Sequence, residues 1–102
     1  MKRFEYIKCF WKFIDKETPV LIFYEVDLEN ERYATRMVEV FWDKTAKRVI
    51  EEGFDFITEA PVPKIEEINK EAEFNAEIIS KEEFESVYNA KEYLGNIDFP
   101  DF

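Results

Sequence analysis

The sequence contains no histidine and a single cysteine, Cys9. Without histidine, Ser–His and Cys–His catalytic arrangements are excluded, and the Cys/His ligand sets of zinc, haem and iron–sulfur sites cannot form. Cys9 has no partner for an intrachain disulfide, and it lies within an alternating apolar pattern where a thiol behaves as a small hydrophobic side chain. This cysteine usage favours a reducing compartment.

Glycine and long apolar runs are also scarce. The two glycines, Gly53 and Gly95, belong to no glycine-rich motif, which excludes a phosphate-binding loop of the usual kind. Glu5 and Lys8 interrupt the apolar residues near the start, and no later run approaches the roughly eighteen residues of a membrane-spanning helix. We therefore expect a cytoplasmic protein without a membrane-bound segment and without a cofactor.

The net charge of −10 is distributed unevenly along the 102 residues. Residues 1–50 contain ten Lys/Arg and nine Asp/Glu, whereas residues 51–102 contain four and fifteen. A negative surface repels phosphate backbones and attracts basic proteins, so nucleic acid is not expected as a partner. Acidic excess also favours solubility by itself, which leaves a non-specific explanation of the charge open.

Alternating and continuous apolar patterns in the first half predict an antiparallel sheet. Residues 4–14 alternate, and residues 20–26 are almost wholly apolar, as in a central strand packed on both faces. Symmetric closure of the first hairpin pairs Cys9 with Tyr24, and centring the next hairpin on Asn30 pairs Tyr24 with Arg36. Both registers predict one core face, which comprises Ile7, Cys9, Trp11, Phe13, Val20, Ile22, Tyr24, Val38, Val40 and Trp42.

The opposite face of this predicted sheet mixes aromatic and charged side chains. We expect it to be covered at least partly by the chain itself or by a partner, because it is too apolar for ordinary solvent exposure. Its aromatic residues Phe10, Phe23 and Phe41 are candidate anchors in a partner or homodimer interface.

Arg36 fits the apolar pattern poorly, because it shares the predicted core face with Val38 and Val40. An unpaired guanidinium would be costly there, so we expect it to stack on Tyr24 and to form a structural ion pair with Glu31 or Asp27. A binding role for Arg36 is the alternative. Asp27, Glu29 and Glu31 lack the glycine and ligand spacing of a calcium loop, and no metal site or catalytic residue is predicted.

The second half predicts short elements and two helices. Residues 48–52 form a fourth strand, residues 54–60 an optional edge strand, and residues 63–71 a short helix after Pro63. Residues 73–79 read as an extended connector. Ser80 with Glu83 forms a capping box that begins a second helix, with Phe84, Val87, Tyr88 and Leu94 as its apolar stripe and Gly95 at its end.

The predicted fold class is α+β, in two layers, with an antiparallel sheet of four to five strands packed on one face by two C-terminal helices. Residues 1–95 form the single domain, and residues 96–102 form a C-terminal tail. No second domain fits this length.

Three stretches carry motifs that can be compared with a family. They are Tyr24-Glu25-Val26-Asp27 with Glu31-Arg32-Tyr33 and Arg36 to Phe41, then Glu59 to Pro63 with Glu66-Glu67-Ile68-Asn69, and finally Ile79-Ser80-Lys81-Glu82-Glu83-Phe84-Glu85. Over about residues 5–90 the chain resembles a family of small bacterial domains of unknown function. It departs from that pattern at Glu25, where the family has serine, at the glycine-free turn Asp43-Lys44-Thr45, and at Tyr88, where tryptophan is common.

Members of that family are encountered among the immunity proteins of contact-dependent growth inhibition and related bacterial toxin systems. The resemblance implies a non-enzymatic protein that binds and neutralises a cognate toxin, such as a basic nuclease domain, by blocking its active site or substrate access. A structural or regulatory domain that forms a homodimer through its aromatic sheet face is the alternative. The candidate partner-binding residues are Glu66, Glu67, Glu71, Glu82 and Glu85, with Phe10, Phe23 and Phe41.

Overall fold

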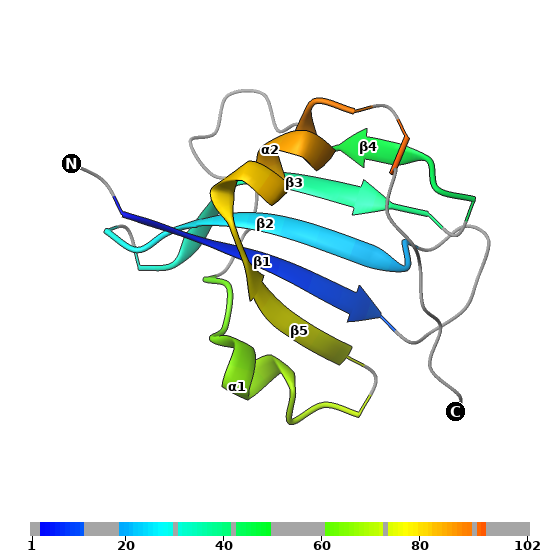
Figure 1. Cartoon of the computed structure of the whole chain (residues 1–102). Helices are drawn as coiled ribbons and strands as arrows, with labels where there is room; N and C mark the ends of the chain where they lie inside the picture. Colours follow the sequence, from blue (N-terminus) through cyan, green and yellow to red (C-terminus); the bar gives the residue numbers. More distant parts are fainter. Residues whose placement is uncertain are drawn as a thin grey trace.

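The computed structural model describes residues 3–11, 19–29, 31–41, 43–49, 61–72, 74–90 and 92–93. These residues form an α+β fold with a five-stranded antiparallel sheet and two helices, as predicted (Figure 1). The strand order in the sheet is β4-β3-β2-β1-β5. The elements are β1 Phe4–Trp11, β2 Leu21–Asp27, β3 Tyr33–Val40, β4 Ala46–Arg48, α1 Ile65–Ile68, β5 Phe74–Ile79 and α2 Lys81–Tyr88.

The continuous apolar run of the sequence becomes the middle strand of the sheet. β2 lies between β1 and β3, and six of its seven residues are buried. A strand covered on both faces has no solvent side on which to place polar residues, which explains why alternation is lost here. The prediction of a central strand at this position is confirmed.

The pairing of β1 with β2 differs from the predicted register by two residues. Cys9 pairs with Ile22 and Ile7 with Tyr24, and the last backbone hydrogen bond runs from Trp11 N to Val20 O at 2.8 Å. Because side chains alternate with a period of two, this shift leaves the residues of β1 and β2 on their predicted faces. Ile7, Cys9 and Ile22 therefore do share one face. Val20, which precedes β2, is the exception: it lies in the cluster on the opposite face.

The pairing of β2 with β3 contains a β-bulge that the sequence pattern did not predict. Near the loop, Val26 pairs with Ala34 and Asp27 with Tyr33, as centring on Asn30 requires. Beyond the bulge, Glu25 pairs with Arg36 and Phe23 with Val38, so Thr35 is the extra residue. A slip of one residue moves the rest of a strand to the other face, and the predicted placement of Val38 and Val40 with Ile22 is therefore wrong.

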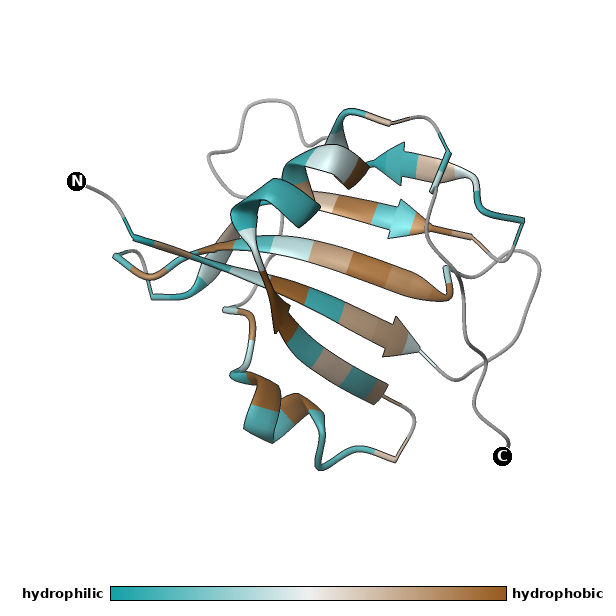
Figure 2. Cartoon of the chain, viewed as in Figure 1, coloured by the Kyte–Doolittle hydropathy of each residue, from teal (hydrophilic) through white to brown (hydrophobic). Residues whose placement is uncertain are grey.

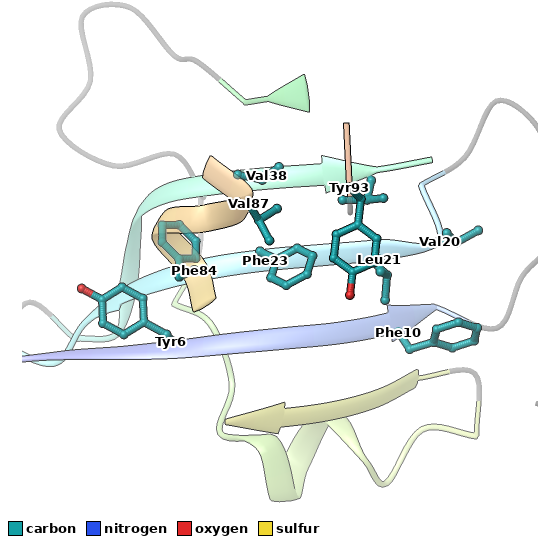
Figure 3. Packing of buried hydrophobic residues seen from close by; sticks show 10 residues of the cluster. Tyr6, Phe10, Val20, Leu21, Phe23, Val38, Phe84, Val87 and Tyr93 are labelled. Atoms are coloured by element: carbon teal, nitrogen blue, oxygen red, sulfur yellow. The ribbon is translucent and has the colours of Figure 1, made fainter. Parts of the chain in front are cut away.

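The sheet has a hydrophobic cluster on each face instead of one core face. We call the first the α2 face; Phe84 and Val87 of α2 pack there with Tyr93 (Figure 3). Its sheet residues are Tyr6, Phe10, Leu21, Phe23, Val38 and Val40, and Val20, just before β2, packs with them.

We call the second the α1 face, where Ile65 and Ile68 of α1 pack. Its buried sheet residues are Ile7, Cys9, Ile22, Val26, Ala34 and Ala76. The two helices therefore contact opposite faces, in contrast to the expected single helical layer. Figure 1 shows α1 beside β5 and α2 across the other side of the sheet.

The second half of the chain forms a strand where a connector was predicted. β5 pairs antiparallel with β1, with Ile79 opposite Tyr6 and Phe74 opposite Trp11. Its apolar residues Phe74, Ala76 and Ile78 alternate with the polar Asn75 and Glu77, which is the pattern of a half-buried strand, and the pairing with β1 completes it. The fourth strand, predicted at residues 48–52, lies at Ala46–Arg48. Residues 50–52 and the predicted edge strand 54–60, together with Phe13 and Trp42, lie outside the described residues.

Helix α2 begins where the capping signal placed it. Ser80 is the N-cap, and its side-chain oxygen accepts a hydrogen bond from Glu83 N at 3.0 Å. The helix ends at Tyr88 with Asn89 as the C-cap, earlier than predicted. Leu94, Gly95 and the tail 96–102 lie outside the described residues.

Candidate functional site

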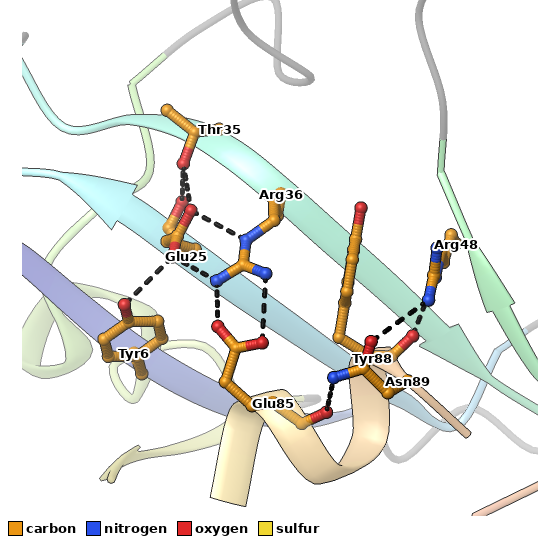
Figure 4. Close-up of polar contacts among 8 residues, drawn as sticks. All are labelled: Tyr6, Glu25, Thr35, Arg36, Arg48, Glu85, Tyr88 and Asn89. Carbon is orange, nitrogen blue, oxygen red and sulfur yellow. Dashed lines mark hydrogen bonds and ion pairs between the residues drawn. The ribbon is translucent and has the colours of Figure 1, made fainter. Parts of the chain in front are cut away.

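A buried polar cluster lies between β2, β3 and α2 on the α2 face (Figure 4). Glu25 is only 6% exposed, and Arg36 binds it with two hydrogen bonds, Nε to Oε1 at 2.9 Å and Nη2 to Oε2 at 2.6 Å. On its other side, Arg36 donates from Nη1 to Glu85 Oε2 at 3.2 Å and from Nη2 to Glu85 Oε1. One guanidinium thus joins the central strand to the second helix.

The bulge in β3 supplies a second donor to the same carboxylate. Thr35 Oγ1 donates to Glu25 Oε1 at 2.7 Å, and Tyr6 of β1 donates its hydroxyl to Glu25 Oε2 at 2.9 Å. Because Thr35 is the extra residue, both Thr35 and Arg36 reach the Glu25 side chain. We call Tyr6, Glu25, Thr35, Arg36 and Glu85 the Arg36 cluster.

The contacts of the Arg36 cluster shift the pKa of its members. Burial opposes ionisation of Glu25, but hydrogen bonds from Arg36, Thr35 and Tyr6 together hold its pKa below the usual value of 4.5. The hydrogen bond from Arg36 likewise lowers the pKa of Glu85, and those two carboxylates raise the pKa of Arg36. Burial, reinforced by Glu25, raises the pKa of the Tyr6 hydroxyl to about 12.

These shifts predict acid sensitivity. A carboxylate whose pKa is lower in the folded state stabilises the fold above its unfolded pKa, and this contribution is lost as the pH falls through the folded value. With unfolded values of 4.5 for Glu25 and Glu85, we expect the free energy of unfolding to decline below about pH 5. Urea unfolding across a pH series measures this.

Two conservative variants separate the cluster from the remaining carboxylates. Glu85→Gln removes one shifted group, so the decline in unfolding free energy between neutral and acid pH should become shallower. Glu82→Gln changes an exposed position on the same helix and should keep the wild-type slope. Equal slopes in all three proteins would contradict the role of the cluster in acid stability.

Aromatic rings extend the contact between α2 and the sheet. The Arg36 guanidinium carbon lies 5.0 Å from the Phe84 ring centre and 4.7 Å from that of Tyr88. Arg48 covers Tyr88 at 4.1 Å and donates from Nε to Tyr88 O at 2.7 Å. Two arginines of the sheet thus hold the C-terminal end of α2, where cations also favour the helix dipole.

The chemistry of the Arg36 cluster is that of a structural clamp. Each nitrogen of the guanidinium donates to Glu25 or Glu85, and both oxygens of Glu25 accept hydrogen bonds from within the chain. The Arg36 nitrogens therefore serve contacts within the chain. In the part of the chain that the structure describes, no three His, Cys, Asp or Glu side chains gather as metal ligands.

The structure corrects the predicted partners of Arg36. A structural ion pair is present, but it joins Arg36 to Glu25 and Glu85 in place of Glu31 or Asp27. Glu31 is exposed with a positive φ of 56°, and the buried Asp27 accepts a hydrogen bond from Glu29 N at 2.9 Å. The predicted stacking on Tyr24 is replaced by Phe84 and Tyr88, because the bulge turns Arg36 towards α2.

The predicted aromatic anchors belong largely to the core. Phe23 is fully buried and Phe10 is 9% exposed, both within the cluster under α2 and Tyr93. The chain itself therefore covers this face, so these two residues are not surface anchors and offer no homodimer contact. Phe41 is half-buried, with Lys47 Nζ 5.3 Å from its ring centre.

The predicted acidic residues lie on the two helices and in the segment that follows α1. Glu66 and Glu67 on α1, Glu71 after it, and Glu82 on α2 are exposed, whereas Glu85 is bound to Arg36. In Figure 2 hydrophilic residues are prominent on α1, along β5 and at the start of α2. We call the exposed carboxylates from α1 to α2 in the sequence the acidic rim, which comprises Glu66, Glu67, Glu71, Glu77, Glu82 and Glu83.

Arg32 is a second structural arginine that sequence reasoning missed. It donates from Nε to Val62 O at 2.8 Å and from Nη2 to Glu5 Oε1 at 2.9 Å, and its own carbonyl accepts from Val62 N at 2.7 Å. These bonds fasten the charged hairpin to the segment before α1. The signal for the other missed residue, Glu25, was a lone carboxylate in an otherwise apolar strand.

The fold and its clamp define a class: a small α+β domain whose two helices contact opposite faces of one antiparallel sheet. No helix in the described ranges has the length and apolar character needed to cross a membrane. The chain belongs to the family described as a domain of unknown function, DUF6881, whose model matches residues 5–93. Searches of curated proteins and of solved structures gave no match to the chain.

Proposed function

We propose that this chain is an immunity protein that binds a cognate bacterial toxin domain in the cytoplasm and blocks its active site or substrate access. The toxin domain would carry a basic surface, as a nuclease does to bind its polyanionic substrate. The observation that carries the proposal is the acidic rim. Its carboxylates face solvent, whereas Arg32 and Arg36 are bound to the chain's own carboxylates and carbonyls.

The balance of exposed charge along the second half supports a basic partner. Between Lys64 and Tyr88, the described residues expose the six carboxylates of the acidic rim and three lysines, Lys64, Lys70 and Lys81. Lys70 lies 3.2 Å from Glu67 and Lys8 lies 3.9 Å from Glu77, so these two carboxylates are partly neutralised. Among the described residues, the other four carboxylates of the acidic rim have no such ion pair. Opposite charge accelerates association and selects against acidic partners.

Binding rather than catalysis is supported by the use of the polar groups. The charged groups of the Arg36 cluster, of which Glu25 is buried and Arg36 and Glu85 are partly buried, bind one another and hold α2 on the sheet. The solvent-facing groups of the acidic rim are carboxylates on short elements. A protein with a fixed interior and a charged exterior is suited to occlude a partner's active site.

Co-expression tests the proposal directly. The coding region adjacent and upstream should be expressed with and without this chain, and growth and complex formation measured. We expect growth inhibition that this chain relieves, together with a complex that co-purifies. Absence of toxicity to relieve, or of any complex, would remove the immunity function.

A further inference from the structure

The outer edge of β5 carries backbone groups that point away from the sheet. The hydrogen bond from Trp11 N to Val20 O shows that the backbone groups of Trp11 face β2, and alternation gives the same orientation to Cys9 and Ile7. Their partners on the other side, Phe74, Ala76 and Ile78, therefore direct their N–H and C=O groups outwards. Strand β5 is thus an edge at which another strand can pair.

The chain itself occupies two of these three positions. Phe74 N donates to Glu71 O at 3.1 Å. Asn69 contacts both outward groups of Ala76: its Oδ1 accepts from Ala76 N at 2.6 Å, and its Nδ2 donates to Ala76 O at 3.0 Å. The Asn69 amide thus takes the place of a neighbouring strand at Ala76 and closes this part of the edge.

Ile78 is the open position. Among the described residues, no hydrogen-bond partner is found for its outward N–H and C=O. Ile78 is 49% exposed, and no other large apolar residue in the described ranges is as exposed as this. It borders a pocket of about 270 Å³, whose other lining residues are Glu5, Arg32, Lys64, Ile65 and Glu66.

We propose that the β5 edge at Ile78 binds a short extended segment of the basic toxin partner, which adds to the sheet as a further strand. The segment pairs its backbone with Ile78 N–H and C=O. One of its Lys or Arg side chains enters the pocket and lays its aliphatic stem on Ile65 and Ile78. Its charge is directed to Glu66 and away from Lys64, because the other pocket carboxylate, Glu5, is already paired with Arg32. This inference rests on the proposed function, because it takes the basic partner from it and identifies its contact.

Charge favours such a segment over a second copy of this chain. Two copies would each bring a net charge of −10 to the contact. Asn69 already binds Ala76, and Ser80 O accepts from Phe84 N at 3.1 Å, so backbone pairing at this edge is confined to Ile78 for either occupant. The side chain that enters the pocket therefore has to supply the rest of the contact.

The test uses a blocked peptide of alternating lysine and valine, with its glutamate and valine counterpart as the charge control. Backbone amide NMR of the full chain should show the lysine peptide shifting the Ile78 amide, and the glutamate peptide should leave it unchanged. Ile78→Pro removes the outward N–H without removing a bond to β1, so binding of the lysine peptide should weaken by roughly tenfold or more. Ile78→Thr keeps the outward N–H, so its affinity for the lysine peptide should fall much less.

The β1 and α2 amide resonances serve as the check that both variants fold. An unperturbed Ile78 amide, equal binding of the two peptides, or wild-type binding by folded Ile78→Pro would overturn the proposal. So would sedimentation showing a dimer that Ile78→Pro dissolves, since the occupant would then be a second copy.

Failure of this inference is distinguishable from failure of the proposed function. Peptide binding at Ile78 with no toxin neutralised leaves the edge site standing and removes the immunity function. If the Ile78→Pro variant binds the toxin with the affinity of the wild-type chain, the immunity function is supported and the binding site at the β5 edge is ruled out.

Discussion

Arg36→Ala is expected to lower the free energy of unfolding by about 3 kcal/mol, because it leaves the carboxylate of Glu25 buried without its cation. Glu25 is 6% exposed and would retain only the hydroxyls of Tyr6 and Thr35. Glu85 would lose its attachment to the sheet at the same time. Urea denaturation followed by circular dichroism measures the loss, and α2 amides should exchange faster.

Two further variants identify the cause. Adding Glu25→Gln to Arg36→Ala should recover part of the stability, since a buried amide costs less than a buried charge. Arg3→Ala removes an exposed pair with Glu29, whose side chains are 74% and 47% exposed, and should change stability by less than about 1 kcal/mol. An Arg36→Ala protein as stable as the Arg3→Ala protein would contradict the structural role.

Phe84→Ala is expected to cost about 3–5 kcal/mol. The Phe84 side chain is fully buried, and its ring lies 5.2 Å from that of Tyr6 and 5.8 Å from that of Tyr88. Its removal opens a cavity between α2 and the sheet. Because small domains are stabilised by only about 5–15 kcal/mol, a substantial unfolded fraction is expected on mild heating.

Glu82→Ala provides the matched control for Phe84→Ala. It lies on the same helix but is exposed, so its effect on stability should stay within about 0.5 kcal/mol. Thermal melts and urea unfolding of both variants compare the two positions. A Phe84→Ala protein that melts with the control would show that α2 contributes little to the fold.

Local sequence signals predicted those elements whose cause is local. The apolar run ending at Val26 gave the central strand, and Ser80 with Glu83 placed the start of α2. Strand β5 was predicted only as an extended connector, although Asn75 and Glu77 alternate with apolar neighbours as in a half-buried strand; its partner β1 lies more than sixty residues earlier. Pairing between residues distant in the sequence is not encoded in either stretch alone.

The bulge at Thr35 accounts for the main error in the predicted core. One extra residue, with no glycine or proline to mark it, turns Val38 and Val40 towards α2. It also determines the Arg36 cluster, because it brings Thr35 and Arg36 to the same carboxylate. The sequence suggested that Arg36 needs an anion, but its partners depended on this unpredicted register.

The dependence of the toxin association rate on salt tests the central claim most directly. With the purified toxin domain, stopped-flow mixing should show the rate falling by roughly tenfold or more between about 20 mM and about 300 mM salt. A variant carrying Glu66→Lys, Glu71→Lys and Glu82→Lys, all at exposed positions, should fold normally, bind more slowly and lose much of this dependence. A rate indifferent to both salt and charge reversal would contradict a function carried by the acidic rim.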